Sequence, residues 1–231
     1  MDDVGATLVS VHFPKTAGTS FGLALRQCYG EGLQEDYGML ALNTPRVRRE
    51  WDAIRSGLAT RFDGGPPAAV HGHFLPIKYR IALRNHPTRY VTWLRHPVER
   101  LLSHYYFWQR TSAAATPAQP LRYRVAREQW SLDRFCLAPQ LRNLYSQYLW
   151  GFPPSRFDFI GITERYESDL ASFARRFLPG AATAQRARVN TERGDAPYPV
   201  DPELRTRIER HHADDMRLYR WALARRDHRP G

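Results

Sequence analysis

Short apolar runs rich in β-forming residues recur along this chain of 231 residues, and segments of helical periodicity separate them. The apolar runs cover residues 7–13, 68–71, 89–94 and 157–162. Runs of this length that end at turn residues are typical of buried strands. Strands that alternate with helices indicate a mainly parallel sheet with helices on both faces. The sequence therefore predicts a three-layer α/β/α fold.

Helix signals fall between these strands. Thr19 or Ser20 can cap a first helix, Pro97 fits the first turn of another, and Thr163 can cap a third. The remaining helical segments are expected at residues 46–58, within 121–149, and at 202–224. Residues 111–120, rich in Ala, Thr and Pro, are expected to form a loop. The chain shows no internal repeat and no clear boundary, so a single domain over residues 1–231 is predicted.

Composition narrows the possible partners and the compartment. The formal net charge of +11 favours anionic partners, and Lys15 and Lys78 are the only lysines among 34 basic residues. A lysine in an arginine-rich chain indicates a site that needs a compact point charge. The absence of a long apolar run, of a secretory signal and of a disulfide framework predicts a cytoplasmic protein without a membrane span. No His, Cys, Asp or Glu cluster has metal-ligand spacing, so no metal is expected.

The loop after the first strand carries the clearest chemistry. It reads Pro14, Lys15, Thr16, Ala17, Gly18, Thr19 and Ser20. A strand that feeds a helix through such a loop presents main-chain N–H groups and the positive helix end to an anion, and the lysine and hydroxyls add further donors. A plain turn followed by a helix cap would explain the same residues. The lysine precedes the glycine, so the loop does not fit the kinase-type pattern G-x-x-x-x-G-K-[ST].

Residues 12–20 resemble the 5′-phosphosulfate loop of sulfotransferases that use 3′-phosphoadenosine-5′-phosphosulfate (PAPS). Residues 91–103 resemble the 3′-phosphate signature of the same superfamily. Within it, the chain is most similar to a bacterial type of the branch that contains the heparan and dermatan sulfate uronosyl 2-O-sulfotransferases. Four further segments carry this likeness: residues 70–74, 103–107, 161–164 and 188–193.

The resemblance implies a role for particular residues. Residues 14–20 would hold the 5′-phosphosulfate, and Arg95 and Ser103 the 3′-phosphate. Lys15 would stabilise the leaving group, His73 would be the base that takes the acceptor proton, and His71 would support it. The resemblance also implies a loop that closes over the nucleotide, formed by Arg188, Asn190, Thr191 and Arg193. The product would be 3′,5′-adenosine bisphosphate.

Several positions in and after the 3′-phosphate signature need separate comment. The family commonly has an aspartate where this chain has His96, which could alter how the segment is anchored. Glu99 and Arg100 follow in the next helix and could pair with each other there rather than contact a ligand. The aromatic residues 105–108 are expected to lie mostly in the core, although one could stack on adenine.

Several functions stay open at this point. The resemblance favours transfer of a sulfuryl group to a hydroxyl of a carbohydrate or glycolipid, by in-line attack with a histidine base. Sulfation of a small molecule or lipid is the alternative acceptor class. A P-loop phosphotransferase would need Mg²⁺ and an aspartate at a second strand end. A non-catalytic polyanion binder would fit the charge alone, but no nucleic-acid-binding module is visible and nucleic acid is not expected as a partner. The oligomeric state is left open.

Overall fold

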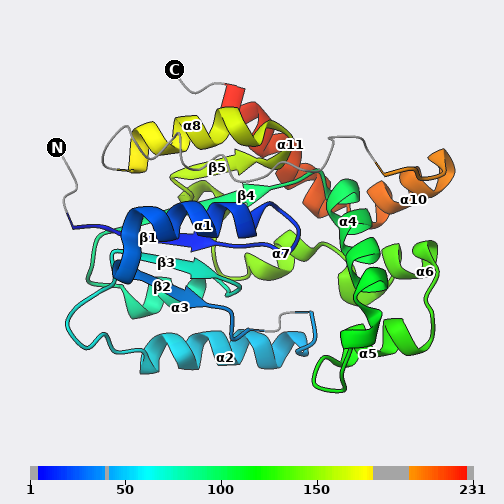
Figure 1. The fold of residues 1–231 in the computed structure, drawn as a ribbon, viewed down its shortest axis with the longest axis horizontal. Coiled ribbons are helices and arrows are strands. Elements are labelled where there is room, and N and C mark those ends of the chain that lie inside the picture. Colours follow the sequence, from blue (N-terminus) through cyan, green and yellow to red (C-terminus); the bar gives the residue numbers. More distant parts are fainter. Residues whose placement is uncertain (1–4, 40–41, 179–197, 228–231) are drawn as a thin grey trace.

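The computed structural model describes residues 5–39, 42–178 and 198–227. Its strands are β1 (Thr7–Val11), β2 (Leu33–Asp36), β3 (Ala69–Gly72), β4 (Thr88–Leu94) and β5 (Phe159–Ile162). All neighbouring strands pair in parallel, in the order β2-β3-β1-β4-β5. The predicted parallel sheet is therefore confirmed, with β1 at its centre (Figure 1).

Helices cover both faces of this sheet. The structure describes α1 (Gly18–Tyr29), α2 (Arg46–Ala59), α3 (Ile77–Ala82), α4 (Pro97–Arg110), α5 (Pro120–Arg127), α6 (Leu132–Cys136), α7 (Leu144–Tyr148), α8 (Tyr166–Phe177), α10 (Pro202–His211) and α11 (Ala213–Asp227). Helices α1 and α8 pack on one face, where Phe21 and Phe173 contact Trp93 and Phe159. Helices α3, α7 and α11 pack on the other face. The predicted three-layer fold is confirmed (Figure 1).

A third apolar cluster lies beyond the carboxyl ends of the strands. Helices α4, α5, α6 and α10 gather there (Figure 1). They are joined by buried side chains that include Leu101, Leu121, Phe135 and Ile208. This group of helices forms a wall beside the edge of the sheet at which β1, β3 and β4 end.

The structure differs from the sequence-based expectations at a few elements. Strand β2 was not predicted, because its residues Leu33–Asp36 are largely polar and exposed at the edge of the sheet. Helix α3 was also missed. The single helix expected over residues 202–224 is divided at His212, whose buried ring hydrogen-bonds outside the helix to the Cys136 carbonyl and the Asn143 N–H. Within the described residues, no helix has both the length and the apolar character needed to cross a bilayer.

Candidate functional site

The candidate site lies at the carboxyl edge of the three central strands. In the sheet register, Val11 at the end of β1 is opposite Gly72 of β3 on one side and Thr92 of β4 on the other. The segments that follow these strands carry Lys15, His73 and Arg95, so three predicted residues meet at one edge. The chain runs from β1 to β2 on one side of β1 in the sheet, and from β3 to β4 on the other side. Such a reversal of strand order is a topological switch point, where α/β proteins commonly bind ligands.

The loop between β1 and α1 has the backbone of an anion-binding turn. Lys15 and Ala17 have left-handed φ angles of 69° and 61°. Thr16 is buried between them, and its hydroxyl donates to the Phe13 carbonyl at 2.9 Å. A main chain that alternates in this way turns successive N–H groups toward one concave side. The Thr16 hydroxyl proton is already used inside the loop, so this residue could serve an anion through its main-chain N–H.

The start of α1 also corrects a prediction. The helix begins at Gly18, its N-cap residue is Ala17, and no side chain caps it, so neither Thr19 nor Ser20 is the cap. The first N–H groups of a helix have no partner within the helix. Without a capping side chain, these donors and the positive end of the helix dipole are directed at whatever occupies the loop. Thr163 likewise does not cap α8, because a 3₁₀ turn at Thr163–Arg165 precedes that helix.

The Lys15 side chain reaches across to α4. Its Nζ atom lies 4.1 Å from the centroid of the Phe107 ring, within the range of a cation–π contact. Phe107 is 37% exposed and therefore lies outside the core, although residues 105–108 were expected to lie mostly within it. Trp108 in the same run is buried, as expected. The contact holds the lysine charge beside the loop and ties the loop to the wall of helices.

His73 follows β3 and is held in one tautomer. Its Nδ1 atom lies 2.6 Å from the His12 carbonyl oxygen. A carbonyl can only accept a hydrogen bond, so Nδ1 carries the proton and the lone pair of a neutral ring is on Nε2. Burial lowers the pKa of His73, partly offset by this hydrogen bond. A neutral imidazole with an available Nε2 is the form that a general base requires.

His71 has a different environment from His73. It is 1% exposed, and both of its ring nitrogens are occupied. Nε2 donates to the Gly18 carbonyl at 3.2 Å, and Nδ1 accepts from the Ser10 hydroxyl at 2.8 Å. Burial lowers its pKa to about 4. The ring therefore joins β1 and β3 to the start of α1, in a supporting position behind His73.

His12 and Tyr37 complete this cluster, and sequence reasoning missed both. The His12 ring stacks on His71 at a centroid distance of 5.2 Å and lies 4.3 Å from His73. Tyr37 packs edge-on against all three imidazoles, and its hydroxyl is 3.3 Å from His12 Nδ1. Burial lowers the pKa of His12 well below its usual value, and His73, His71 and Lys15 lower it further. Tyr37 follows the unpredicted strand β2, so no sequence signal pointed to it.

Arg95 is positioned through its main chain. Its N–H donates to the Tyr145 hydroxyl oxygen at 3.0 Å, and the Tyr145 O–H donates to the Arg95 carbonyl at 2.7 Å. Within the described part of the chain, the Arg95 guanidinium forms no ion pair. The adjacent His96 N–H donates to Glu164 Oε1 at 2.7 Å, so Glu164 anchors this segment even though His96 replaces the family's aspartate. Ser103 is buried on α4.

The expected pairing of Glu99 with Arg100 is wrong. Glu99 Oε1 instead accepts from both terminal nitrogens of Arg205 on α10, at 2.9 and 2.8 Å. Arg100 is fully buried, on the inner side of α4. The two charged side chains therefore point away from each other and serve different parts of the molecule.

Some predicted features lie elsewhere. Arg188, Asn190, Thr191 and Arg193 are outside the described residues. Among residues 5–39, 42–178 and 198–227, no group of His, Cys, Asp or Glu side chains has an arrangement that could hold a metal ion.

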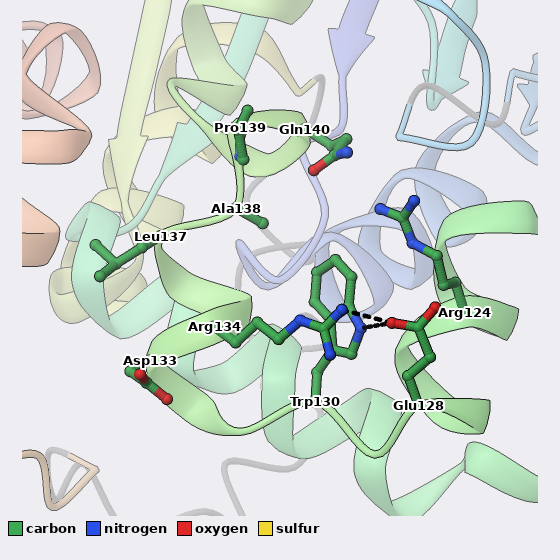
Figure 2. A pocket seen from close by; sticks show the side chains of 9 residues that line it. All are labelled: Arg124, Glu128, Trp130, Asp133, Arg134, Leu137, Ala138, Pro139 and Gln140. Atoms are coloured by element: carbon green, nitrogen blue, oxygen red, sulfur yellow. Dashed lines mark hydrogen bonds and ion pairs between the residues drawn. The ribbon is translucent and has the colours of Figure 1, made fainter.

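Figure 2 shows a surface pocket in which the guanidinium groups of Arg124 and Arg134 lie 5.0 and 4.5 Å from the Trp130 ring. None of the predicted site residues lines this pocket.

Comparison with solved structures shows a structural likeness to a known protein. A solved sulfotransferase from Alicyclobacillus acidocaldarius is similar to this chain with a TM-score of 0.47 and 15% sequence identity, over 91% of this chain and 92% of that one. No protein-family model matches the chain, and no curated protein matches it. A similarity this low does not identify a reaction, so the function must be inferred from the residues of the site.

Proposed function

We propose that this protein is a sulfotransferase that moves a sulfuryl group from PAPS to an acceptor hydroxyl. The observation that carries the proposal is the meeting, at one edge of the sheet, of an uncapped anion loop with Lys15, a base-competent His73 and the Arg95 segment. The sequence resemblance assigns the same residues to the two ends of the donor. PAPS bears anionic groups at both its 5′ and 3′ positions, and these residues would supply a cationic group for each.

The chemistry follows from where charge changes during transfer. The acceptor oxygen attacks sulfur, and the bond between sulfur and the bridging oxygen of the 5′-phosphate breaks. Negative charge grows on that bridging oxygen, where the Lys15 ammonium and the loop N–H groups would stabilise it. The acceptor proton passes to Nε2 of His73. The products are the sulfated acceptor and 3′,5′-adenosine bisphosphate.

His73, rather than His71, is the base in this proposal. Nε2 of His73 holds the lone pair, whereas both nitrogens of His71 are already hydrogen-bonded to Gly18 and Ser10. Protonating His71 would break its bond from the Ser10 hydroxyl inside the fold. His71 is therefore assigned a positioning role, as it holds the end of β3 against the start of α1.

The acceptor class rests on the resemblance to the uronosyl 2-O-sulfotransferase branch. Residues 70–74 carry that likeness and include both histidines. On this basis we propose a carbohydrate or glycolipid hydroxyl, with a small molecule or lipid as the alternative. A phosphotransferase is less consistent with the site, because His73 and Arg95 follow β3 and β4 where an aspartate for Mg²⁺ would be needed.

Two experiments test the proposal in sequence. Isothermal titration calorimetry should detect 3′,5′-adenosine bisphosphate binding without Mg²⁺, and weaker binding of 5′-AMP. Incubation with ³⁵S-labelled PAPS and a panel of glycans, glycolipids and host extracts should then yield a labelled acceptor. Mg²⁺-dependent ATP binding in place of bisphosphate binding would support the phosphotransferase. Binding of any polyanion, with a steep salt dependence and no preference for the bisphosphate, would support the non-catalytic alternative.

A further inference from the structure

Part of the inner face of α4 is polar, beside the apolar residues Val98, Leu101 and Leu102. Arg100, Ser103 and His104 are 0%, 1% and 4% exposed, so three polar side chains lie on the side of the helix that faces the protein interior. Nε and Nη1 of Arg100 and Nδ1 of His104 are buried, and among the described residues they have no hydrogen-bond partner. Buried polar groups in native proteins are nearly always satisfied, so a cluster of exceptions calls for a physical reason.

Arg100 is the most costly of these groups because it is a permanent cation. In the described part of the chain, no carboxylate lies within ion-pair distance of its guanidinium. The buried Asp215 interacts with it electrostatically, but the Asp215 oxygens accept hydrogen bonds from the Tyr145 and Ser146 main chain and the Ser146 hydroxyl. A buried charge without a close counter-charge destabilises the folded state, so its presence indicates another use.

The position of Arg100 points to that use. Arg100 and Ser103 are three residues apart, so they lie on the same side of α4. The Arg100 guanidinium carbon is 5.8 Å from the centroid of the Tyr145 ring. The Tyr145 hydroxyl in turn holds the Arg95 main chain by two hydrogen bonds. Arg100 is therefore linked to the Arg95 main chain through Tyr145 and shares one side of α4 with Ser103.

We propose that Arg100 is a positioning residue for the phosphate that Arg95 and Ser103 bind. This role for Arg100 rests on the proposed function, because that phosphate is the 3′-phosphate of the donor. The buried cation acts across a low-dielectric interior without touching the ligand, and its contact with Tyr145 fixes the Arg95 segment. A bound phosphate supplies Arg100 with a counter-charge in addition to Asp215.

The test is the selectivity between 3′,5′-adenosine bisphosphate and 5′-AMP, measured by calorimetry. R100M should weaken bisphosphate binding by about tenfold, as expected for one charge acting over several ångströms at an effective dielectric constant near 20. The affinity for 5′-AMP, which lacks the 3′-phosphate, should change less than about twofold. R100K keeps the charge and should restore most of the selectivity. R110M, the same change at the exposed far end of α4, is the matched control and should bind both nucleotides as the wild type does.

Thermal unfolding supplies a second, independent measurement. Removing an uncompensated buried cation should raise the melting temperature of ligand-free R100M, whereas loss of a purely structural arginine would lower it. If R100M does not fold, R100Q carries the same test because it also removes the charge. An equal loss of both nucleotides, or unchanged selectivity in a folded variant, overturns the role of Arg100. Failure of the wild type to prefer the bisphosphate would instead refute the proposed function.

Discussion

Replacing Gly18 by alanine tests whether the loop and the histidine cluster form one unit. A Cβ atom at this position would lie 1.8 Å from His12 Nε2 and 2.0 Å from Cδ2. Real Cβ atoms essentially never approach within 3.0 Å of another heavy atom, so the His12 ring has to move by more than about 1 Å. His71 and His73 flank that ring at centroid distances of 5.2 and 4.3 Å, which limits where it can go.

The magnitude follows from two opposing contributions. Alanine in place of a helix glycine stabilises by up to about 1 kcal/mol, and less at the first position of a helix. Overpacking against a confined ring costs about 1–3 kcal/mol. We therefore expect Gly18→Ala to lower the free energy of unfolding by about 1–2 kcal/mol. Displacement of His12 and the loop should also weaken binding of 3′,5′-adenosine bisphosphate by at least about tenfold.

Urea unfolding followed by circular dichroism measures the first effect, and calorimetry measures the second. Gly22→Ala, one turn further along α1, is the matched control. Its Cβ would lie 3.0 Å from His71 Nε2, so it requires a shift of only a few tenths of an ångström, against more than about 1 Å at Gly18. The control should unfold within about 1 kcal/mol of the wild type and bind the bisphosphate normally. Wild-type stability and binding in Gly18→Ala would refute the reasoning that His12 and the anion loop are packed together.

Four further predictions concern charge and protonation. H73N keeps an N–H that can donate to the His12 carbonyl but removes the base. Its turnover with the acceptor found in the PAPS screen should fall about a hundredfold or more, while its bisphosphate binding persists. The control variant H86N should keep the turnover of the wild type. Because burial lowers the His73 pKa, the acid limb of the wild-type rate profile should have its midpoint below pH 6.5, and a midpoint above that value would exclude a buried His73 as the base. Lys15→Ala should lower turnover by about a hundredfold, with partial recovery in Lys15→Arg; near-normal turnover would remove Lys15 from the leaving-group role. Burial raises the pKa of Asp215 to about 6, above its unfolded value, so this carboxyl contributes stability that is present at low pH and lost as the pH rises through 6. The unfolding free energy of the wild type relative to D215N should therefore be about 1 kcal/mol higher at pH 5 than at pH 8, and no pH dependence of this difference would contradict the assignment.

The strands that sequence analysis predicted correctly share one physical property. The apolar runs that became β1, β3, β4 and β5 are buried on both faces, so their composition announces them without any tertiary information. The edge strand β2 is polar and half exposed, and among the described strands it pairs with β3 alone. Its extended backbone depends on that pairing, which local composition does not encode.

The residues of the site likewise separate into those that the sequence predicted and those that only the tertiary structure revealed. The sequence by itself determined the anion loop with Lys15, the two histidines around β3 and the Arg95 segment, because each is a local motif whose residue types carry the chemistry. Only the tertiary structure decided which histidine has an available nitrogen, because that depends on the His12 carbonyl and on Gly18, both distant in sequence. It likewise placed Phe107 beside Lys15 and left Arg100 buried with no described carboxylate within ion-pair distance. Hydrogen-bond partners and burial are set by contacts between distant segments, and a linear pattern does not contain them.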